Sequence, residues 1–448
     1  MDIRNKKISI IGAVRSGIGA AKLAKKLGAI PFVSDSGSEE KLRSSVELLK
    51  NAKIDFEIGF HSDKIFNCDF MIVSPGVPSN ADVIKKANQK GIRIISEVEF
   101  SSWFCKASII AITGTNGKTT TTSLCGYLFN ECGAKSFTAG NIGLAFSEIV
   151  LDAEKDEYVS LEVSSFQLDL IDTFKPKVAM ILNIAPDHLN RYENSVEKYA
   201  KSKLRIFENQ DGTDFLILNK DSELLNQYFK NAKSQLFYFS TTKKVSNGCY
   251  LDNQKVVFVR NDKVEFSCSV SDIFIQGEHN IQNAMAVIIA AKIFDFENEK
   301  IINALKSFQG VEHRLELVRE IEGIKFVNDS KATNVDSVVV ALKSFNDPIL
   351  LILGGQDKGN DYTMIEQLVI DKVKKIYAIG SSADKVFNFF HKKVKTEIKK
   401  DLDDVINTAL SEGRSGDVVL LSPACASFDM FDNYEHRGKV FKEIVNRK

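Results

Sequence analysis

Short apolar runs alternate with stretches of helical spacing in the first part of the chain. Residues 8–11 form one such run, which ends at Gly12. Residues 16–27 follow with apolar positions at helical spacing, and Gly28 is a natural helix stop. This rhythm of strand and helix predicts a small parallel sheet covered by helices. Its strands are expected at residues 8–11, 30–34, 70–73 and 92–95.

A second unit begins with a buried-type strand at residues 108–112, and a helix to about Cys132 follows the next loop. Residues 235–275 alternate in the manner of antiparallel strands, with Asn247-Gly248 as a turn signal. We place the end of this unit near Phe308–Gly310. Further strands are expected at 158–162 and 178–183, and a helix at 281–293.

A third unit again alternates strands and helices, which predicts a doubly wound sheet. Its strands are expected at 326–328, 349–353, 375–379 and 418–421. The pattern therefore predicts an α/β protein with three domains, at residues 1–96, 97–310 and 311–448. The first is expected to be Rossmann-like and the last doubly wound.

Composition agrees with this organisation and excludes some partners. The chain has 448 residues, about three domains at roughly 150 residues each. Its 59 basic residues balance 59 acidic ones, whereas a dedicated nucleic-acid binder carries a basic excess. No apolar run approaches the roughly 20 residues that span a bilayer. Seven scattered cysteines without a CxxC favour a reducing compartment. We therefore expect a cytoplasmic protein with neither nucleic acid nor membrane as a partner.

The strongest local motif is the loop at residues 114–120, GTNGKTT, between a strand and a helix. Its glycines let backbone N–H groups approach phosphate oxygens, and the helix N-terminus adds positive potential. Lys118 can reach β and γ phosphates, and the Thr119 hydroxyl can hold Mg²⁺. The strict P-loop pattern fails at Ile112, where its first glycine belongs. A capped turn is the alternative, but the context favours nucleotide phosphate binding.

The loop at residues 12–17 is a weaker signal. Val14 occupies a position where a dinucleotide fingerprint has glycine, although Asp35 lies near the spacing expected for a ribose contact. This loop is either a nucleotide-facing loop or a tight packing turn.

Polar residues also follow several other predicted strands, where open α/β sheets bind ligands. Glu162 suits Mg²⁺, which prefers oxygen ligands. His188 is a candidate site residue only in combination with the P-loop. Residues 328–334 and 354–359 are each weakly informative alone. Cys425 is expected to be a small packed thiol, because no convergent base is evident.

Read together, these motifs resemble the Mur ligases, the ATP-dependent amide-forming enzymes of peptidoglycan assembly. The match spans essentially the whole chain and keeps the family's order, with segments 114–119, 161–167, 183–192, 279–283, 313–314 and 328–334. Within the family the sequence most resembles the branch that adds D-glutamate. Segments 140–143, 202–209 and 421–429 carry that choice, and the last is the most specific.

The resemblance implies a UDP-binding domain, a central P-loop ATPase domain and an amino-acid-binding domain. It implies that ATP phosphorylates the carboxylate of UDP-N-acetylmuramoyl-L-alanine (UDP-MurNAc-L-Ala), and that the amine of D-glutamate attacks the acyl phosphate, releasing ADP and phosphate. The implied cofactors are two Mg²⁺ ions and a CO₂-derived carbamate on Lys203, a residue that the sequence alone would assign to an exposed helix. A monomer is expected.

The residue roles implied by the resemblance fall into four groups. The catalytic residues are Lys118, Glu162, His188, Lys203 and Lys331, and the metal ligands are Thr119, Glu162, His188 and Lys203. ATP is contacted by Gly114, Thr115, Asn116, Gly117, Lys118, Thr119, Thr120, Asn283, Arg314 and Asp329. The UDP substrate is contacted by Arg15, Ser16, Asp35, Ser36, Gly76, Asn141, Ser164, Gln167 and His188. D-glutamate is contacted by Thr333, Lys358, Ser427, Phe428 and Tyr434.

Other functions remain open at this stage. A sibling Mur ligase or a folate polyglutamate ligase shares several motifs, but the folate enzymes carry their P-loop early, and the Asp-Asn-Pro-Arg motif of diaminopimelate-adding enzymes is absent. Val14 counts against an NAD-dependent dehydrogenase. Intact Lys118, Glu162, His188 and Lys203 count against a non-catalytic nucleotide-binding protein. Gly37 stands where some relatives carry an arginine, and Arg15 is expected to supply that charge near the UDP phosphates.

Overall fold

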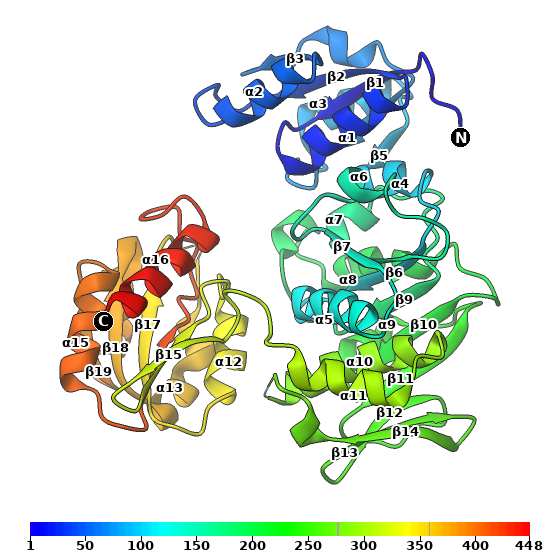
Figure 1. Ribbon diagram of the computed structural model, residues 1–448. Coiled ribbons are helices and arrows are strands. Elements are labelled where there is room, and N and C mark those ends of the chain that lie inside the picture. The colour runs from blue at the N-terminus through cyan, green and yellow to red at the C-terminus, as the bar shows by residue number, and fades with distance from the viewer. Residues whose placement is uncertain (276, 358) are drawn as a thin grey trace. The chain divides into compact units, whose positions relative to one another are not determined.

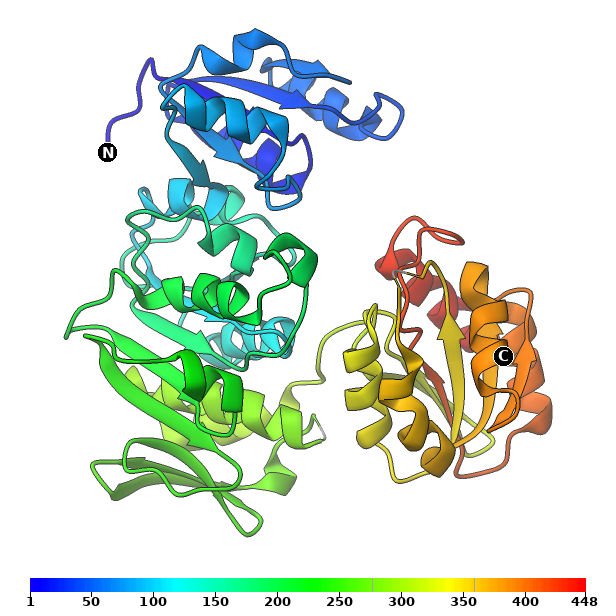
Figure 2. The same cartoon turned by 180° about the vertical axis from the view of Figure 1, so that it is seen from behind.

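Three β-sheets organise the chain, and helices flank each of them (Figures 1 and 2). The computed structural model describes residues 1–275, 277–357 and 359–448. It divides into one unit of Met1–Phe274 with Asn280–Phe308, and a second of Ile275–His279 with Gln309–Lys448. The first two sheets share the first unit, so the predicted limit at residue 96 remains a prediction.

The N-terminal sheet is parallel throughout, in the order β3-β2-β1-β4-β5. Apolar residues of α1 and α2 pack on one face and those of α3 join a separate core. Gly12, at φ +102°, lies where the loop after β1 meets the loop after β4, and a Cβ there would be 2.7 Å from the Cβ of Ser74. The elements are β1 (Lys7–Ile11), α1 (Arg15–Lys26), β2 (Ile30–Asp35), α2 (Arg43–Asn51), β3 (Asp55–Ile58), β4 (Phe70–Val73), α3 (Asp82–Gln89) and β5 (Ile94–Ser96).

The central sheet has the order β14-β13-β12-β11-β10-β9-β6-β8-β7. Strands β6 to β12 pair in parallel, and only the pairs β12–β13 and β13–β14 are antiparallel. The P-loop joins β6, a central strand, to α5. The strands are β6 (Ser108–Thr113), β7 (Ser136–Gly140), β8 (Tyr158–Glu162), β9 (Val178–Ile181), β10 (Phe215–Asn219), β11 (Gln235–Ser240), β12 (Gly248–Asp252), β13 (Lys255–Arg260) and β14 (Lys263–Ser269). The helices are α4 (Glu97–Ser102), α5 (Lys118–Glu131), α6 (Phe146–Ile149), α7 (Ser165–Leu168), α8 (Val196–Leu204), α9 (Glu223–Tyr228), α10 (Glu278–Ile293) and α11 (Asn298–Ser307).

The C-terminal sheet has the order β15-β16-β20-β17-β18-β19, and only the edge pair β15–β16 is antiparallel. Apolar residues of α12, α13 and α14 pack on one face, and those of α15 and α16 on the other. The elements are β15 (Glu316–Ile321), β16 (Ile324–Asn328), α12 (Val335–Lys343), β17 (Ile349–Gly354), α13 (Glu366–Lys372), β18 (Val373–Ile379), α14 (Ala383–Phe390), β19 (Lys395–Ile398), α15 (Leu402–Glu412), β20 (Val418–Leu421) and α16 (Tyr434–Arg447).

The α/β class is confirmed, and one local expectation was wrong. The segment 235–275 was expected to be antiparallel throughout, but β11 and β12 extend the parallel sheet and antiparallel pairing begins only at β13. Strands β3, β7, β10, β15 and β19 were not predicted. No helix within the described residues is long and apolar enough to cross a membrane.

Candidate active site

The P-loop closes around its own lysine. Gly117 caps α5 in the left-handed conformation at φ +84°, and Lys118 is the first residue of the helix. The Lys118 ammonium donates to the carbonyls of Gly114 (2.9 Å) and Thr115 (2.8 Å). Thr119 and Thr120 are buried in the first turn. The predicted phosphate loop, whose residues are buried or half-buried, thus ends at a helix N-terminus, an arrangement that suits nucleotide phosphates.

Asn183, which the site prediction left out, braces this loop. Its Oδ1 accepts from the backbone N–H of Thr115 (3.1 Å) and Asn116 (2.8 Å), and its Nδ2 donates to the Asn116 carbonyl (3.1 Å). Its place shortly after β9, beside β6, was the available signal, because the carboxyl ends of adjacent parallel strands meet at one edge.

A second lysine meets the same loop from α8. The buried Lys203 ammonium donates to the Gly114 carbonyl at 2.8 Å, so Lys118 and Lys203 share that oxygen. Burial, and then the neighbouring Lys118 charge, lower the pKa of Lys203 well below its usual value. The nitrogen also lies 4.6 Å from the ring centroid of Tyr199. The expectation of an exposed helical lysine was wrong, because α8 turns this face toward the P-loop.

Glu162 ends β8 with one carboxylate oxygen unsatisfied. Oε1 accepts from the Asn141 amide at 3.0 Å, whereas the buried Oε2 has no hydrogen-bond partner among the residues that the structure describes. A buried carboxylate oxygen without a donor is costly unless a cation binds it. Glu162 therefore fits a Mg²⁺ ligand, with Asn141 as the side chain that orients it.

His188 lies in a left-handed turn (φ 51°) before a short 3₁₀ helix, Leu189–Arg191. Its ring packs edge-on against Phe166 with centroids 5.3 Å apart, and its Nε2 lies 3.7 Å from an Asp187 carboxylate oxygen. The Asp187 charge acts on Lys203 as well. The structure thus gathers the loops after β6, β8 and β9 at one edge of the central sheet.

Two residues predicted to contact the UDP substrate have a structural task. Ser164 and Gln167 form a capping box at the start of α7, in which both the N–H and the hydroxyl of Ser164 donate to Gln167 Oε1. Their contact with substrate remains a prediction.

The other predicted UDP residues surround the carboxyl edge of the N-terminal sheet. Asp35 accepts from the backbone N–H of Ala13 and Gly37, both at 2.7 Å, and so shapes the loop after β1. The hydroxyl oxygens of Ser16 and Ser74 lie 3.4 Å apart. Ser36 and Gly76 are exposed. Arg15 donates to the Gly143 carbonyl at 2.6 Å, so it joins the N-terminal loop to the loop of Asn141.

In the C-terminal unit, predicted residues meet at the ends of β16 and β20, which are adjacent parallel strands. Asp329 accepts from the Ser422 hydroxyl at 2.8 Å and from the Leu315 N–H at 3.3 Å. Burial raises the pKa of Asp329 to about 7, and the Arg314 charge opposes that rise. Lys331 lies 5.3 Å from the ring centroid of Tyr434. Thr333 belongs to the same loop, and its N–H donates to the Lys331 carbonyl.

The segment after β20 contributes Ser427, which is buried, and Phe428, which is 67% exposed. Arg437, another residue that the sequence did not single out, holds this segment. The buried guanidinium donates to the carbonyls of Ser330 (2.8 Å) and Cys425 (3.1 Å). No local pattern in α16 distinguished Arg437 from an exposed helical arginine. Cys425 is buried, and that burial raises its pKa. Lys358 lies outside the described residues.

The predicted ATP residues fall into two groups. Residues 114–120 and Asn283 lie in the first unit, where the Asn283 side-chain oxygen is the nearest atom, at 2.6 Å, to a Cβ placed on Gly117. Arg314 and Asp329 lie in the second unit.

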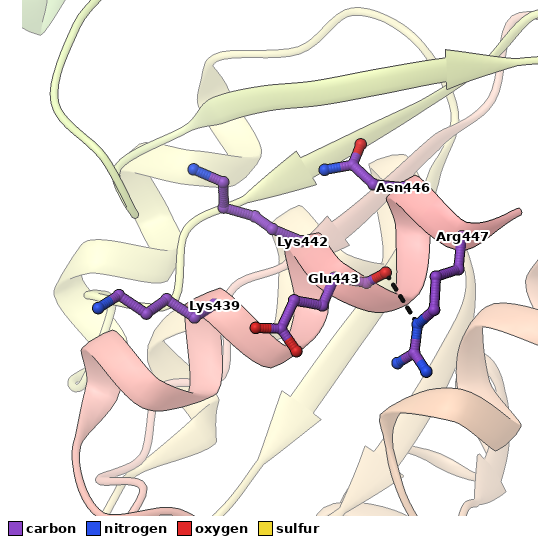
Figure 3. Close-up of a pocket in the computed structure, with 5 residues that line it drawn as sticks. All are labelled: Lys439, Lys442, Glu443, Asn446 and Arg447. Carbon is purple, nitrogen blue, oxygen red and sulfur yellow. Dashed lines mark hydrogen bonds between the residues drawn. The ribbon is translucent and has the colours of Figure 1, made fainter.

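One surface cavity contains none of these residues. It has a volume of about 580 Å³ and lies along the second half of α16, lined by Lys439, Lys442, Glu443, Asn446 and Arg447 (Figure 3). Lys442 already pairs with Glu312 (2.9 Å) and Glu316 (2.5 Å), so this cation is engaged within the protein. We assign this cavity no role in the site.

A glycine-rich loop that runs from a parallel strand into a helix, with a buried acid and a buried lysine beside it, is typical of nucleotide-binding α/β enzymes that transfer phosphoryl groups. Three family models match the chain in order: the MurD N-terminal domain at residues 7–83, the Mur ligase middle domain at 112–291, and the Mur ligase glutamate ligase domain at 313–425. The chain belongs to the Mur ligase family.

Curated relatives match along their whole length. Proteins named UDP-N-acetylmuramoylalanine–D-glutamate ligase are similar at 42% identity in Chloroherpeton thalassium (99% of this chain, 98% of the relative) and at 43% in Christiangramia forsetii (98% and 99%). The relative of that name from Clostridioides difficile is 40% identical over 100% of this chain and 99% of its own.

Solved structures share the fold at low sequence identity. The UDP-N-acetylmuramate–alanine ligase of Thermotoga maritima superposes with a TM-score of 0.64 at 19% identity, covering 99% of both chains. A pseudomurein peptide ligase from Methanothermus fervidus gives 0.60 at 19%, covering 99% of this chain and all of its own. Escherichia coli FolC gives 0.60 at 14% identity, over 84% of this chain and 99% of its own.

Proposed function

We propose that this chain is an ATP-dependent ligase that joins D-glutamate to UDP-MurNAc-L-Ala in peptidoglycan precursor synthesis. Full-length similarity of about 40% to relatives of that name is the observation that carries the proposal. The ATP-dependent step is proposed to take place at the P-loop, with Glu162 and Lys203 beside it. We further propose that the enzyme acts in the cytoplasm as a monomer.

The proposed reaction has two steps that balance without another reactant. A carboxylate oxygen of the L-alanyl group attacks the γ-phosphorus of ATP, and ADP leaves. The amine of D-glutamate then attacks the acyl carbon, phosphate leaves, and the amine loses a proton. Phosphorylation is needed because a carboxylate has no competent leaving group. Cations must screen the first step, since both reacting groups are anionic.

In this scheme the P-loop and its lysine bind the phosphates. The Lys118 ammonium sits on two loop carbonyls, and we propose that it transfers to the β and γ phosphates when ATP binds. The backbone N–H groups of residues 114–120 and the Asn283 amide complete the central part of the nucleotide site. Arg314 and Asp329 of the C-terminal unit are proposed as the remaining ATP contacts.

Mg²⁺ is proposed at Glu162, with Thr119 and His188 as further ligands. When bound, the metal would neutralise charge on the phosphates and the attacking carboxylate. The buried, unpartnered Glu162 Oε2 supports this assignment, and the Asn141 amide keeps the carboxylate in place.

Lys203 is proposed to carry a carbamate. The modification converts a cation into an anion with oxygen donors, which suits a second Mg²⁺. Carbamate formation needs a neutral amine, and burial together with Lys118 favours the neutral form by lowering the pKa of Lys203. The Gly114 carbonyl holds the nitrogen beside the P-loop.

Substrate contacts outside the phosphate site remain proposals by residue. Arg15, Ser16, Asp35, Ser36 and Gly76 are assigned to UDP. Asn141, Ser164, Gln167 and His188 are assigned to the muramoyl part. Thr333, Ser427, Phe428 and Tyr434 are assigned to the D-glutamate carboxylates with Lys358, and Lys331 to the reacting groups.

The function is tested by phosphate release with UDP-MurNAc-L-Ala, ATP and one amino acid at a time. D-glutamate is expected to support turnover, whereas L-glutamate, L-alanine and meso-diaminopimelate are not. Release with another amino acid alone would assign a sibling activity. Absence of release with every amino acid would refute the ligase proposal.

A further inference from the structure

Arg191 connects the N-terminal and central parts of the first unit through two backbone carbonyls. Its Nη1 donates to the Pro75 carbonyl at 2.9 Å and its Nη2 to the Val77 carbonyl at 2.7 Å. Pro75 and Val77 flank Gly76, in the loop that follows β4. One guanidinium therefore holds both sides of a residue assigned to the UDP site.

The same side chain is fixed to the central domain. Its guanidinium carbon lies 3.9 Å from the ring centroid of Phe166, whose ring also packs against His188. Arg191 ends the 3₁₀ helix that begins after His188, and its backbone N–H donates to the His188 carbonyl at 2.9 Å. Movement of Arg191 would therefore displace His188.

Packing around this contact is incomplete. A cavity of about 50 Å³ lies between the two sides, lined from the N-terminal side by residues such as Ser74 and Ile84 and from the central side by Leu170 and Arg191. Among the described residues, Arg191 forms no ion pair, so its charge is held by neutral carbonyls and an aromatic ring. Hydrogen bonds from a planar, two-pronged donor, more than close packing, thus set the position of the Gly76 loop relative to the central part. The loop's own shape is held within the N-terminal part, where the Val77 N–H donates to the Ser74 carbonyl (3.0 Å) and the Ser74 N–H to the Ile11 carbonyl (2.9 Å).

We propose that Arg191 is a positioning residue that fixes the distance between the UDP loop at Gly76 and the reacting end of the site at His188. This inference rests on the proposed function, in which a single substrate contacts both. UDP alone contacts only the N-terminal loops, whereas UDP-MurNAc-L-Ala must contact both the Gly76 loop and the His188 region at the same time.

Loss of Arg191 should change the affinity for UDP-MurNAc-L-Ala but not the affinity for UDP alone. When two sites for one ligand are held at a fixed separation, the second contact forms at a high effective concentration. Loss of the connection lowers that effective concentration without changing the first contact. Removal of Arg191 should therefore weaken the binding of UDP-MurNAc-L-Ala and leave the binding of UDP alone unchanged.

The experiment measures dissociation constants of UDP and of UDP-MurNAc-L-Ala by titration calorimetry on the full chain. For Arg191→Ala we expect the UDP value to stay within about twofold and the substrate value to rise roughly tenfold, because two charge-assisted hydrogen bonds are lost. Arg191→Lys should give a smaller rise, because an ammonium keeps the charge and can donate to one of the two carbonyls, although it cannot reproduce the planar fork. This variant keeps the test available if the alanine variant folds poorly.

Arg205→Ala is the matched control. Arg205 also donates to two backbone carbonyls, those of Asp169 (2.6 Å) and Ile171 (2.8 Å), but both lie within the central domain. It should lower the thermal midpoint while keeping the ratio of the two dissociation constants.

Equal weakening of UDP and substrate in Arg191→Ala would overturn the proposal, and so would an unchanged substrate constant. The same ratio change in Arg205→Ala would reduce the effect to general destabilisation and also overturn it. These failures differ from failure of the proposed function, in which the wild-type protein would not bind UDP-MurNAc-L-Ala at all.

Discussion

Replacement of Asn183 by alanine tests whether a side chain outside the phosphate loop sets the affinity for ATP. Asn183 makes three hydrogen bonds to the backbone of Thr115 and Asn116. The Thr115 N–H keeps an alternative acceptor in the variant, because it also donates to the Asn183 main-chain carbonyl at 3.0 Å. Two bonds are therefore lost outright, at a net value of about 1 kcal/mol each. A loss of about 2 kcal/mol in loop preorganisation corresponds to roughly 30-fold weaker ATP binding.

The assay is the KM for ATP together with the dissociation constant of a non-hydrolysable ATP analogue. Asn209→Ala serves as the matched control, since the Asn209 amide donates to the carbonyls of Asp172 (3.0 Å) and Phe174 (3.1 Å), away from the loop. We expect Asn209→Ala to lower thermal stability and to leave the ATP constants unchanged. Unchanged ATP binding in Asn183→Ala would refute the bracing role.

Three further changes test other parts of the site. Lys118→Ala should abolish phosphate release while the circular dichroism spectrum stays native, and normal turnover would exclude the P-loop assignment. Lys203→Ala should be inactive and partly rescued by small carboxylic acids, whereas full activity without them would remove the carbamate. Because the folded pKa of Asp329 is about 7 and its usual value is 3.8, the folded protein binds the extra proton between these values, and stability from this group falls as pH rises from about 4 to 7. Denaturant unfolding of wild type and Asp329→Asn should therefore diverge by about 4 kcal/mol across that range, and parallel pH profiles would contradict it.

Much of the fold could be predicted from strand periodicity and glycine stops. The strand Ser108–Thr113 and the P-loop after it were visible because a fully apolar run ends in a glycine-rich turn. Short strands with few apolar residues, such as Asp55–Ile58 and Lys395–Ile398, were not, because an edge strand buries too little to show a clear pattern. Parallel pairing of β11 and β12 was missed for another reason. Alternation reports a half-buried strand and carries no information on the direction of its neighbour.

The candidate site shows the same division. Lys118 and Glu162 could be selected because Lys118 begins a helix after a glycine-rich loop and Glu162 ends a recognisable strand. Asn183 was passed over although its place after β9 was a signal. Arg437 could not be selected, since it acts on a backbone carbonyl, that of Ser330, far away in the sequence. Burial of Lys203 was equally invisible, because an isolated lysine in a polar helix looks exposed until the helix is packed. Contacts that depend on tertiary packing leave no local signal.

The zero net charge of the chain is compatible with the binding of anionic substrates. Every proposed substrate is anionic, and within the described residues the ammonium groups of Lys118 and Lys203 both donate to the Gly114 carbonyl of the P-loop. Recognition in this account depends on a few placed charges, backbone N–H groups and Mg²⁺, and not on an overall basic field.

The most direct test of the central claim follows an oxygen atom from substrate to phosphate. UDP-MurNAc-L-Ala labelled with ¹⁸O in both carboxylate oxygens is turned over with ATP and D-glutamate. The ¹⁸O content of the products is then measured by mass spectrometry. An acyl-phosphate ligase is expected to release phosphate that contains one ¹⁸O and an amide product that retains the other. Unlabelled phosphate, or an amide formed without phosphate release, would contradict the account.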